Sequence, residues 1–218
     1  MKKLLFGTIL LALVGFPIVT MAGVDVNIGI SIPLPPLITF EAPPDVVVLP
    51  DTNGGVYVVP GINVDLFFWN GFWWRPWEGR WYRSPYYDRG WVYYDRVPRF
   101  YYNVDPYWRS HYQNHNWHGH IWNYQPIPHS QLQQNWKGWQ SSRYWEKKKT
   151  CGVQGYAPKP QQQVRVLRQQ RQTLYQQKPE VQQHQEFLRQ QRQAQPQRRG
   201  ESHQQFQGHE GHGEEHRR

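Results

Sequence analysis

Histidine is the residue type that points most directly to chemistry in this chain of 218 residues, and two groups of it stand out. The first group comprises His111, His115, His118 and His120. The second comprises His209, His212 and His216, near His203 and three glutamates. Imidazole nitrogens bind zinc, copper or nickel, so both groups are candidate metal sites. Glycines interrupt the second group, so a site there would be flexible and of modest affinity. The alternatives are ring stacking or structural hydrogen bonds for the first group, and a polar, disordered chain end for the second.

Groups for acid–base or nucleophilic catalysis have weaker support. Asp88 and Asp95 occupy identical Tyr-Tyr-Asp-Arg contexts, and glycosidases use paired carboxylates. We expect instead that each aspartate pairs with the arginine that follows it or caps a turn. The serines lack a GxSxG motif, and Cys151 has no histidine near it in the sequence. The expectation is therefore a protein that is not an enzyme and uses no cofactor.

Aromatic side chains are a further candidate for binding. The chain has 12 Trp, 14 Tyr and 9 Phe, and 23 of these lie within residues 67–125. Rings left exposed would stack on sugar faces, because contiguous exposed apolar area tends to mark an interaction site. The candidate residues for such carbohydrate binding are Trp69, Trp73, Trp77, Trp81 and Trp91. The alternative is that these rings form cross-strand pairs in a hydrophobic core.

The first 22 residues indicate in which compartment the protein acts, and the compartment determines which partners it can meet. Lys2 and Lys3 precede an apolar run at 4–19 and small residues that end at Ala22, a pattern that predicts a signal peptide cleaved after Ala22. The run of 16 residues is shorter than the roughly 20 that span a bilayer. The full sequence has a net charge of +9, which becomes +7 once Lys2 and Lys3 are removed with the signal peptide. Outside the cytoplasm, such a basic chain meets anionic lipid, glycan or cell-wall polymer, so no nucleic-acid partner is expected. Peripheral membrane contact stays open, and no transmembrane span is expected after cleavage.

Composition and periodicity predict the elements that must position these side chains. A β module is expected at 23–125, an amphipathic helix at 126–150 and a low-complexity tail at 151–218. Strict alternation predicts a half-buried strand at 24–32, and short strands at 46–49 and 56–59 flank a turn. Asn70-Gly71 and, less ideally, Glu78-Gly79 predict two hairpins, each within a W-x-G-x-W sequence. The expected fold class is mainly β: a small antiparallel meander rich in aromatic residues.

The last third of the chain is expected to be helical in part. Leu132, Trp136 and Trp139 recur at helical spacing, which predicts a helix at about 131–147 that docks on the β module. Ser130 and Gln133 predict a capping box at its start. Glutamine and arginine dominate the tail, whose apolar residues look too sparse for a core. A disordered or partly helical, basic tail is therefore expected.

The two W-x-G-x-W copies, Trp69 to Trp73 and Trp77 to Trp81, resemble the repeats of exported bacterial envelope proteins grouped as YXWGXW or WXXGXW repeat proteins. The wider resemblance covers about residues 23–150 and is to envelope proteins of Gram-negative bacteria. It implies an exported, β-rich protein and transfers no catalytic residue. We therefore expect a non-catalytic, structural or adaptor protein of the periplasm or outer cell envelope. The alternatives are a carbohydrate or cell-wall binding module, and weak divalent-metal binding through the histidine-rich tail.

Overall fold

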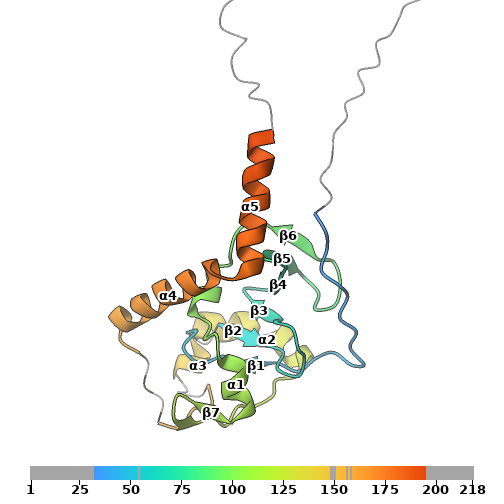
Figure 1. The fold of residues 1–218 in the computed structure, drawn as a ribbon. Helices are drawn as coiled ribbons and strands as arrows, with labels where there is room; N and C mark the ends of the chain where they lie inside the picture. Colours follow the sequence, from blue (N-terminus) through green and yellow to red (C-terminus); the bar gives the residue numbers. More distant parts are fainter. Residues whose placement is uncertain (1–31, 54, 148–150, 156, 158, 195–218) are drawn as a thin grey trace, which may run out of the picture. The chain divides into compact units, whose positions relative to one another are not determined.

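The computed structural model describes residues 32–53, 55–147, 151–155, 157 and 159–194 (Figure 1). The chain divides after Ile32 into two units, and every helix and strand below belongs to the second unit. The predicted signal peptide lies outside the described residues, as does the predicted strand at 24–32 except for its last residue. No helix within the described ranges is both long enough and apolar enough to cross a membrane.

Six short strands form one antiparallel sheet in which each strand pairs with its neighbours in the sequence. They are β1 Val47–Val48, β2 Val56–Val58, β3 Phe67–Trp69, β4 Phe72–Trp77, β5 Arg80–Ser84 and β6 Val92–Tyr94. A separate hairpin pairs β7 Asn116–Trp117 with β8 His120–Ile121. The prediction of a small antiparallel meander is confirmed.

Both predicted hairpins are present. Asn70 and Gly71 have φ values of 51° and 82° in the turn between β3 and β4, and Glu78 and Gly79 have 47° and 71° between β4 and β5. Positive φ at both central residues gives the turn twist that matches antiparallel strands. The two W-x-G-x-W sequences are therefore two successive hairpins that share β4.

The sheet is buried on both faces, because aromatic residues occupy both sides of its central strands. Side chains alternate between the faces, so neighbours in sequence join different clusters. One cluster includes Phe67, Trp74 and Trp81. The other includes Phe68, Trp73 and Tyr82. Tight aromatic packing on both faces makes this sheet the rigid body of the protein.

Buried residues from helices pack in the clusters on both faces of the sheet. The helices are η1 Tyr101–Asn103, α1 Trp108–Gln113, α2 His129–Ser142, α3 Tyr144–Lys147, α4 Gln161–Gln176 and α5 Pro179–Ala194. Buried residues of α1, α4 and α5 pack in the Phe67 cluster. Leu132 of α2 packs in the Phe68 cluster, with Trp136 and Trp139 against it. The predicted docking of this helix through its tryptophans is confirmed.

Two details of the predicted helix at 131–147 are wrong. The segment is two helices, because Arg143 takes a left-handed conformation with φ 54° and ends α2. The predicted capping box is absent: α2 begins at His129, its N-cap is Pro128, and no side chain caps it. Proline sets a favourable φ but offers no acceptor side chain, so the first turn is stabilised by packing instead.

The tail beyond Cys151 is partly helical, as expected, and its helices α4 and α5 have 16 residues each. The sparse apolar residues are nevertheless sufficient to dock both helices. Tyr175 of α4 is 6% exposed and Val181 of α5 is 4% exposed, and both lie in the Phe67 cluster. Each helix is therefore anchored to the folded unit near the junction between α4 and α5.

Candidate functional site

Asp105 is the centre of the most distinctive polar cluster in the described part of the chain. It precedes α1 in an Asp-Pro sequence that favours a turn, and its Oδ1 accepts a hydrogen bond from the Tyr107 backbone N–H at 2.9 Å. Its backbone carbonyl accepts from the Trp108 N–H at 3.1 Å. The residue is 5% exposed, so the start of α1 fixes a buried carboxylate.

His118 is brought to this carboxylate by the β7–β8 hairpin. His118 and Gly119 form its two-residue turn, with φ values of 51° and 90°. Histidine tolerates this left-handed region better than most residues, and Gly119 adopts it freely. The Nε2 atom of His118 lies 3.1 Å from Asp105 Oδ2. A tight turn therefore holds the imidazole against the aspartate.

His111 approaches from the last turn of α1. Its ring packs against those of Trp117 and His118, with centroid distances of 4.9 Å and 4.5 Å. Its Nε2 is 3.8 Å from Asp105 Oδ1 and is buried without a hydrogen-bond partner. One donor atom from each of Asp105, His111 and His118 can be chosen so that all three lie within 4.8 Å of one another.

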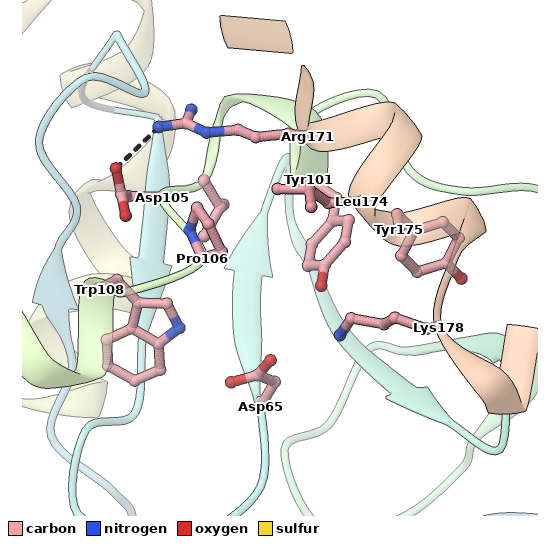
Figure 2. Close-up of a pocket in the computed structure, with 10 residues that line it drawn as sticks. Asp65, Tyr101, Asp105, Pro106, Trp108, Arg171, Leu174, Tyr175 and Lys178 are labelled. Atoms are coloured by element: carbon pink, nitrogen blue, oxygen red, sulfur yellow. Dashed lines mark hydrogen bonds and ion pairs between the residues drawn. The ribbon is translucent and has the colours of Figure 1, made fainter. Parts of the chain in front are cut away.

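Arg171 of α4 pairs with the same carboxylate (Figure 2). Its Nη2 lies 2.9 Å from Asp105 Oδ2, and its Nη1 donates to the Asn103 carbonyl at 2.7 Å. A cavity of about 90 Å³ adjoins this ion pair, and its lining includes Asp65 and Lys178. The cavity is smaller than the roughly 300–1,000 Å³ typical of ligand pockets, so we assign it no organic ligand.

The surroundings favour a neutral imidazole at His118. Burial lowers the pKa of this side chain, an effect that the nearby Asp105 carboxylate opposes and the Lys159 ammonium reinforces. Two imidazole nitrogens and one carboxylate oxygen form a donor set suited to zinc and related transition metals. The cluster is therefore the candidate metal centre of the described chain.

The sequence grouped four histidines here, and the structure brings two of them together. His115 instead stacks on Tyr124, with ring centroids 5.0 Å apart, and His120 lies exposed in β8. Sequence reasoning missed Asp105 and Arg171. The only local signal for Asp105 is an aspartate six residues before His111, at the start of a helix. The other predicted metal group, His209, His212 and His216, lies outside the described residues.

The five tryptophans suggested for sugar stacking are mostly part of the core. Trp73, Trp81 and Trp91 are buried, which corresponds to the structural alternative for them. Trp69 and Trp77 are half-buried and pack against the two clusters.

The two aspartates of the Tyr-Tyr-Asp-Arg sequences make the expected local pairs. Asp88 Oδ2 lies 3.0 Å from Arg89 Nη1, and Asp95 Oδ2 lies 3.6 Å from Arg96 Nε. Each carboxylate is therefore paired with the arginine that follows it, as predicted.

A second hollow, which we call the aromatic groove, lies beside α2 and α3. Its volume is about 500 Å³, and the rings of Trp139, Tyr144 and Trp145 line it. Trp139 and Tyr144 are stacked with their centroids 5.9 Å apart. The polar side chains of the lining are the carboxamides of Asn123, Gln125, Gln131 and Gln154 and the thiol of Cys151. The groove therefore combines flat apolar rings with neutral donors and acceptors.

Comparisons of the chain with protein-family models, curated proteins and solved structures find no match.

Proposed function

We propose that this protein is an exported, non-catalytic component of the cell envelope of a Gram-negative bacterium, of structural or adaptor type. In this proposal the aromatic sheet is the rigid body, and the basic helix α4 contacts anionic envelope polymers such as lipopolysaccharide. The proposal rests on the charge and attachment of α4.

Helix α4 carries the positive charges of Arg165, Arg168 and Arg171 and no acidic residue. Arg165 and Arg168 are exposed, and neither forms an ion pair with a carboxylate among the described residues. The same helix is fixed to the body by Tyr175 and by the Arg171–Asp105 pair. A helix that is anchored at one end and cationic along its exposed side suits a flat anionic surface.

The test is cosedimentation of the chain from residue 23 onwards with lipopolysaccharide. A basic residue near an anionic surface contributes about 1 kcal/mol. The double variant R165Q/R168Q should therefore bind roughly 30-fold more weakly, and binding should weaken strongly at high salt. The matched control Q162A/Q169A changes exposed neutral residues of the same helix and should bind like the wild type. Binding that ignores both salt and the two arginines would refute the proposal.

Export is tested separately, by fractionating cells of the native organism. The proposal requires the protein in the periplasmic or outer-membrane fraction, with its N-terminus at Gly23. Recovery from the cytosol with Met1 retained would contradict it.

The aromatic groove favours carbohydrate binding as a second candidate function. Its three rings offer flat apolar faces, and its four carboxamides donate and accept hydrogen bonds without adding charge. These are the groups that recognise a neutral sugar. Pull-down with insoluble cell-wall polysaccharide should recover the wild type at high salt but not W139A. W136A is the control, because Trp136 packs on Phe68 and does not line the groove. Equal recovery of both variants would exclude the groove as the binding site.

A further inference from the structure

We propose that Asp105, His111 and His118 form a binding site for a divalent transition-metal ion of the zinc class. The site does not include the histidines at the C-terminal end of the chain, and through Arg171 it adjoins helix α4, which carries the proposed envelope role. The first support is geometric. With metal–ligand bonds of about 2.0–2.2 Å, neighbouring ligands in a tetrahedral site lie roughly 3.3–3.6 Å apart. His118 Nε2 lies 3.1 Å from Asp105 Oδ2, and His111 Nε2 lies 3.8 Å from Asp105 Oδ1. One donor atom from each of the three side chains lies within 4.8 Å of the other two, so a small movement of the side chains would bring the donors to that spacing.

The second support is the unpaired nitrogen of His111. A buried polar atom without a partner costs about 1–3 kcal/mol, so such atoms are uncommon in folded proteins. His111 Nε2 is such an atom, and its distance of 3.8 Å to Asp105 Oδ1 is too long for a hydrogen bond. A metal ion between the three side chains would give this nitrogen a ligand bond.

The third support is that the ligands are held in place before any ion binds. The Tyr107 N–H orients Asp105, the left-handed turn holds His118, and packing on Trp117 holds the His111 ring. Helix α1 with the turn before it fixes two ligands and the β7–β8 hairpin fixes the third. Three protein ligands leave a fourth position for water, as in zinc sites of this type. Nitrogen donors favour zinc, copper or nickel over magnesium or calcium.

The positive charge of Arg171 should weaken the binding of a metal ion at this site. The Arg171 guanidinium pairs with Asp105 Oδ2, the oxygen that His118 also approaches, so a bound dication and Arg171 compete for one carboxylate. Removing this positive charge should therefore strengthen metal binding. By reciprocity, a bound metal should weaken the hold of Arg171 on Asp105 and so loosen helix α4. The structure thus couples metal occupancy to the docking of the basic helix.

The experiment is a calorimetric titration with Zn²⁺ of the chain from residue 23 onwards. His203, His209, His212 and His216 are first changed to glutamine, so that the C-terminal histidines do not contribute. This background protein should bind one ion per chain. H118Q should lower the affinity at least tenfold, and because the His118 side chain is 42% exposed, this variant should keep its fold. H111Q should have a similar effect.

Two matched controls distinguish this site from general histidine binding. H115Q and H120Q remove neighbouring histidines outside the cluster and should leave the affinity within about twofold of the background. R171Q should raise the affinity several-fold, whereas R168Q, which removes an exposed charge from the same helix, should not. Tryptophan fluorescence confirms that each variant is folded. The absence of saturable binding below millimolar Zn²⁺ would overturn the proposal, as would equal losses in H118Q and H120Q.

Discussion

The indole N–H of Trp81 donates a hydrogen bond to the hydroxyl of Tyr175 at 2.9 Å, and this bond joins strand β5 to helix α4 inside the core. The two residues are 94 positions apart in the sequence. Through this contact a glutamine-rich helix becomes part of the aromatic body.

Tyr175→Phe should destabilise the protein, because it leaves the buried Trp81 N–H without an acceptor. The expected loss is about 1–3 kcal/mol in the free energy of unfolding, measured by urea denaturation. Tyr107→Phe is the control: Tyr107 is 68% exposed, and the same chemical change there should cost almost nothing. Equal stability of the two variants would show that the bond to Tyr175 is not a fixed part of the fold.

Gly79→Ala should displace helix α5. Gly79 has φ 71°, and a Cβ atom there would lie 2.1 Å from the backbone oxygen of Glu180. Backbone strain and this clash both oppose the substitution, so proteolysis between α4 and α5 should become much faster.

Gly138→Ala is the matched control for that experiment. Gly138 lies inside α2, and apart from its chain neighbours and the backbone of its own helix, no atom of the described residues comes within 4 Å of a Cβ placed there. Alanine is a better helix former than glycine by about 1 kcal/mol, so this variant should be more stable than the wild type. A stable Gly79→Ala variant would contradict the close approach of α5 to the β4–β5 turn.

Cys151 should be unreactive in the native protein. It is 7% exposed, and burial, reinforced by the charges of Asp51 and Glu146, raises the pKa of its thiol to about 12. The thiolate is the reactive form, so alkylation by iodoacetamide at pH 8 should be very slow until the protein unfolds. Mass spectrometry of native and urea-unfolded samples measures the difference. Rapid alkylation under native conditions would show that the segment around Cys151 opens.

The protein should lose stability below about pH 6.5, in part through His129. The His129 ring stacks on that of Trp73, with ring centroids 5.9 Å apart. Burial lowers the pKa of His129, although the negative charge of Asp88 acts in the opposite direction. When the folded-state pKa is lowered, the histidine of the unfolded chain takes up its proton at a higher pH than the histidine of the folded chain does. Its contribution to stability is therefore complete above the unfolded-state pKa of about 6.5 and decreases as the pH falls below that value.

His129→Gln should make the unfolding free energy less dependent on pH between pH 7 and pH 5. Gln134→Ala, a neutral change at an exposed position of the same helix, should leave the pH dependence as it is in the wild type. An unchanged pH dependence in His129→Gln would mean that the imidazole titrates alike in the folded and unfolded states.

The hairpins could be predicted from the sequence because their signal is local. Asn70-Gly71 tolerates positive φ at both positions, and alternating aromatic residues on each side set the register of the strands. The helix at 129–142 was predicted for the same kind of reason, since Leu132, Trp136 and Trp139 lie on one face. The predicted start was wrong because the N-cap residue is Pro128, whereas Ser130, the expected cap, lies inside the first turn.

The docking of α4 and α5 could not be predicted in this way. The fully buried anchors of these helices are Tyr175 and Val181, too few to produce a helical period among many glutamines. The candidate metal centre was predicted only in part for a related reason. His111 and His118 are close in the sequence, whereas Arg171 lies 66 residues from Asp105 and is brought to it only by tertiary packing.

Because every strand of the large sheet pairs with its sequence neighbours, the whole meander is available to a growing chain once residue 94 has been made. Local pairing of this kind favours rapid folding. The helices at 161–194 follow later in the sequence, so the sheet on which they dock can form without them.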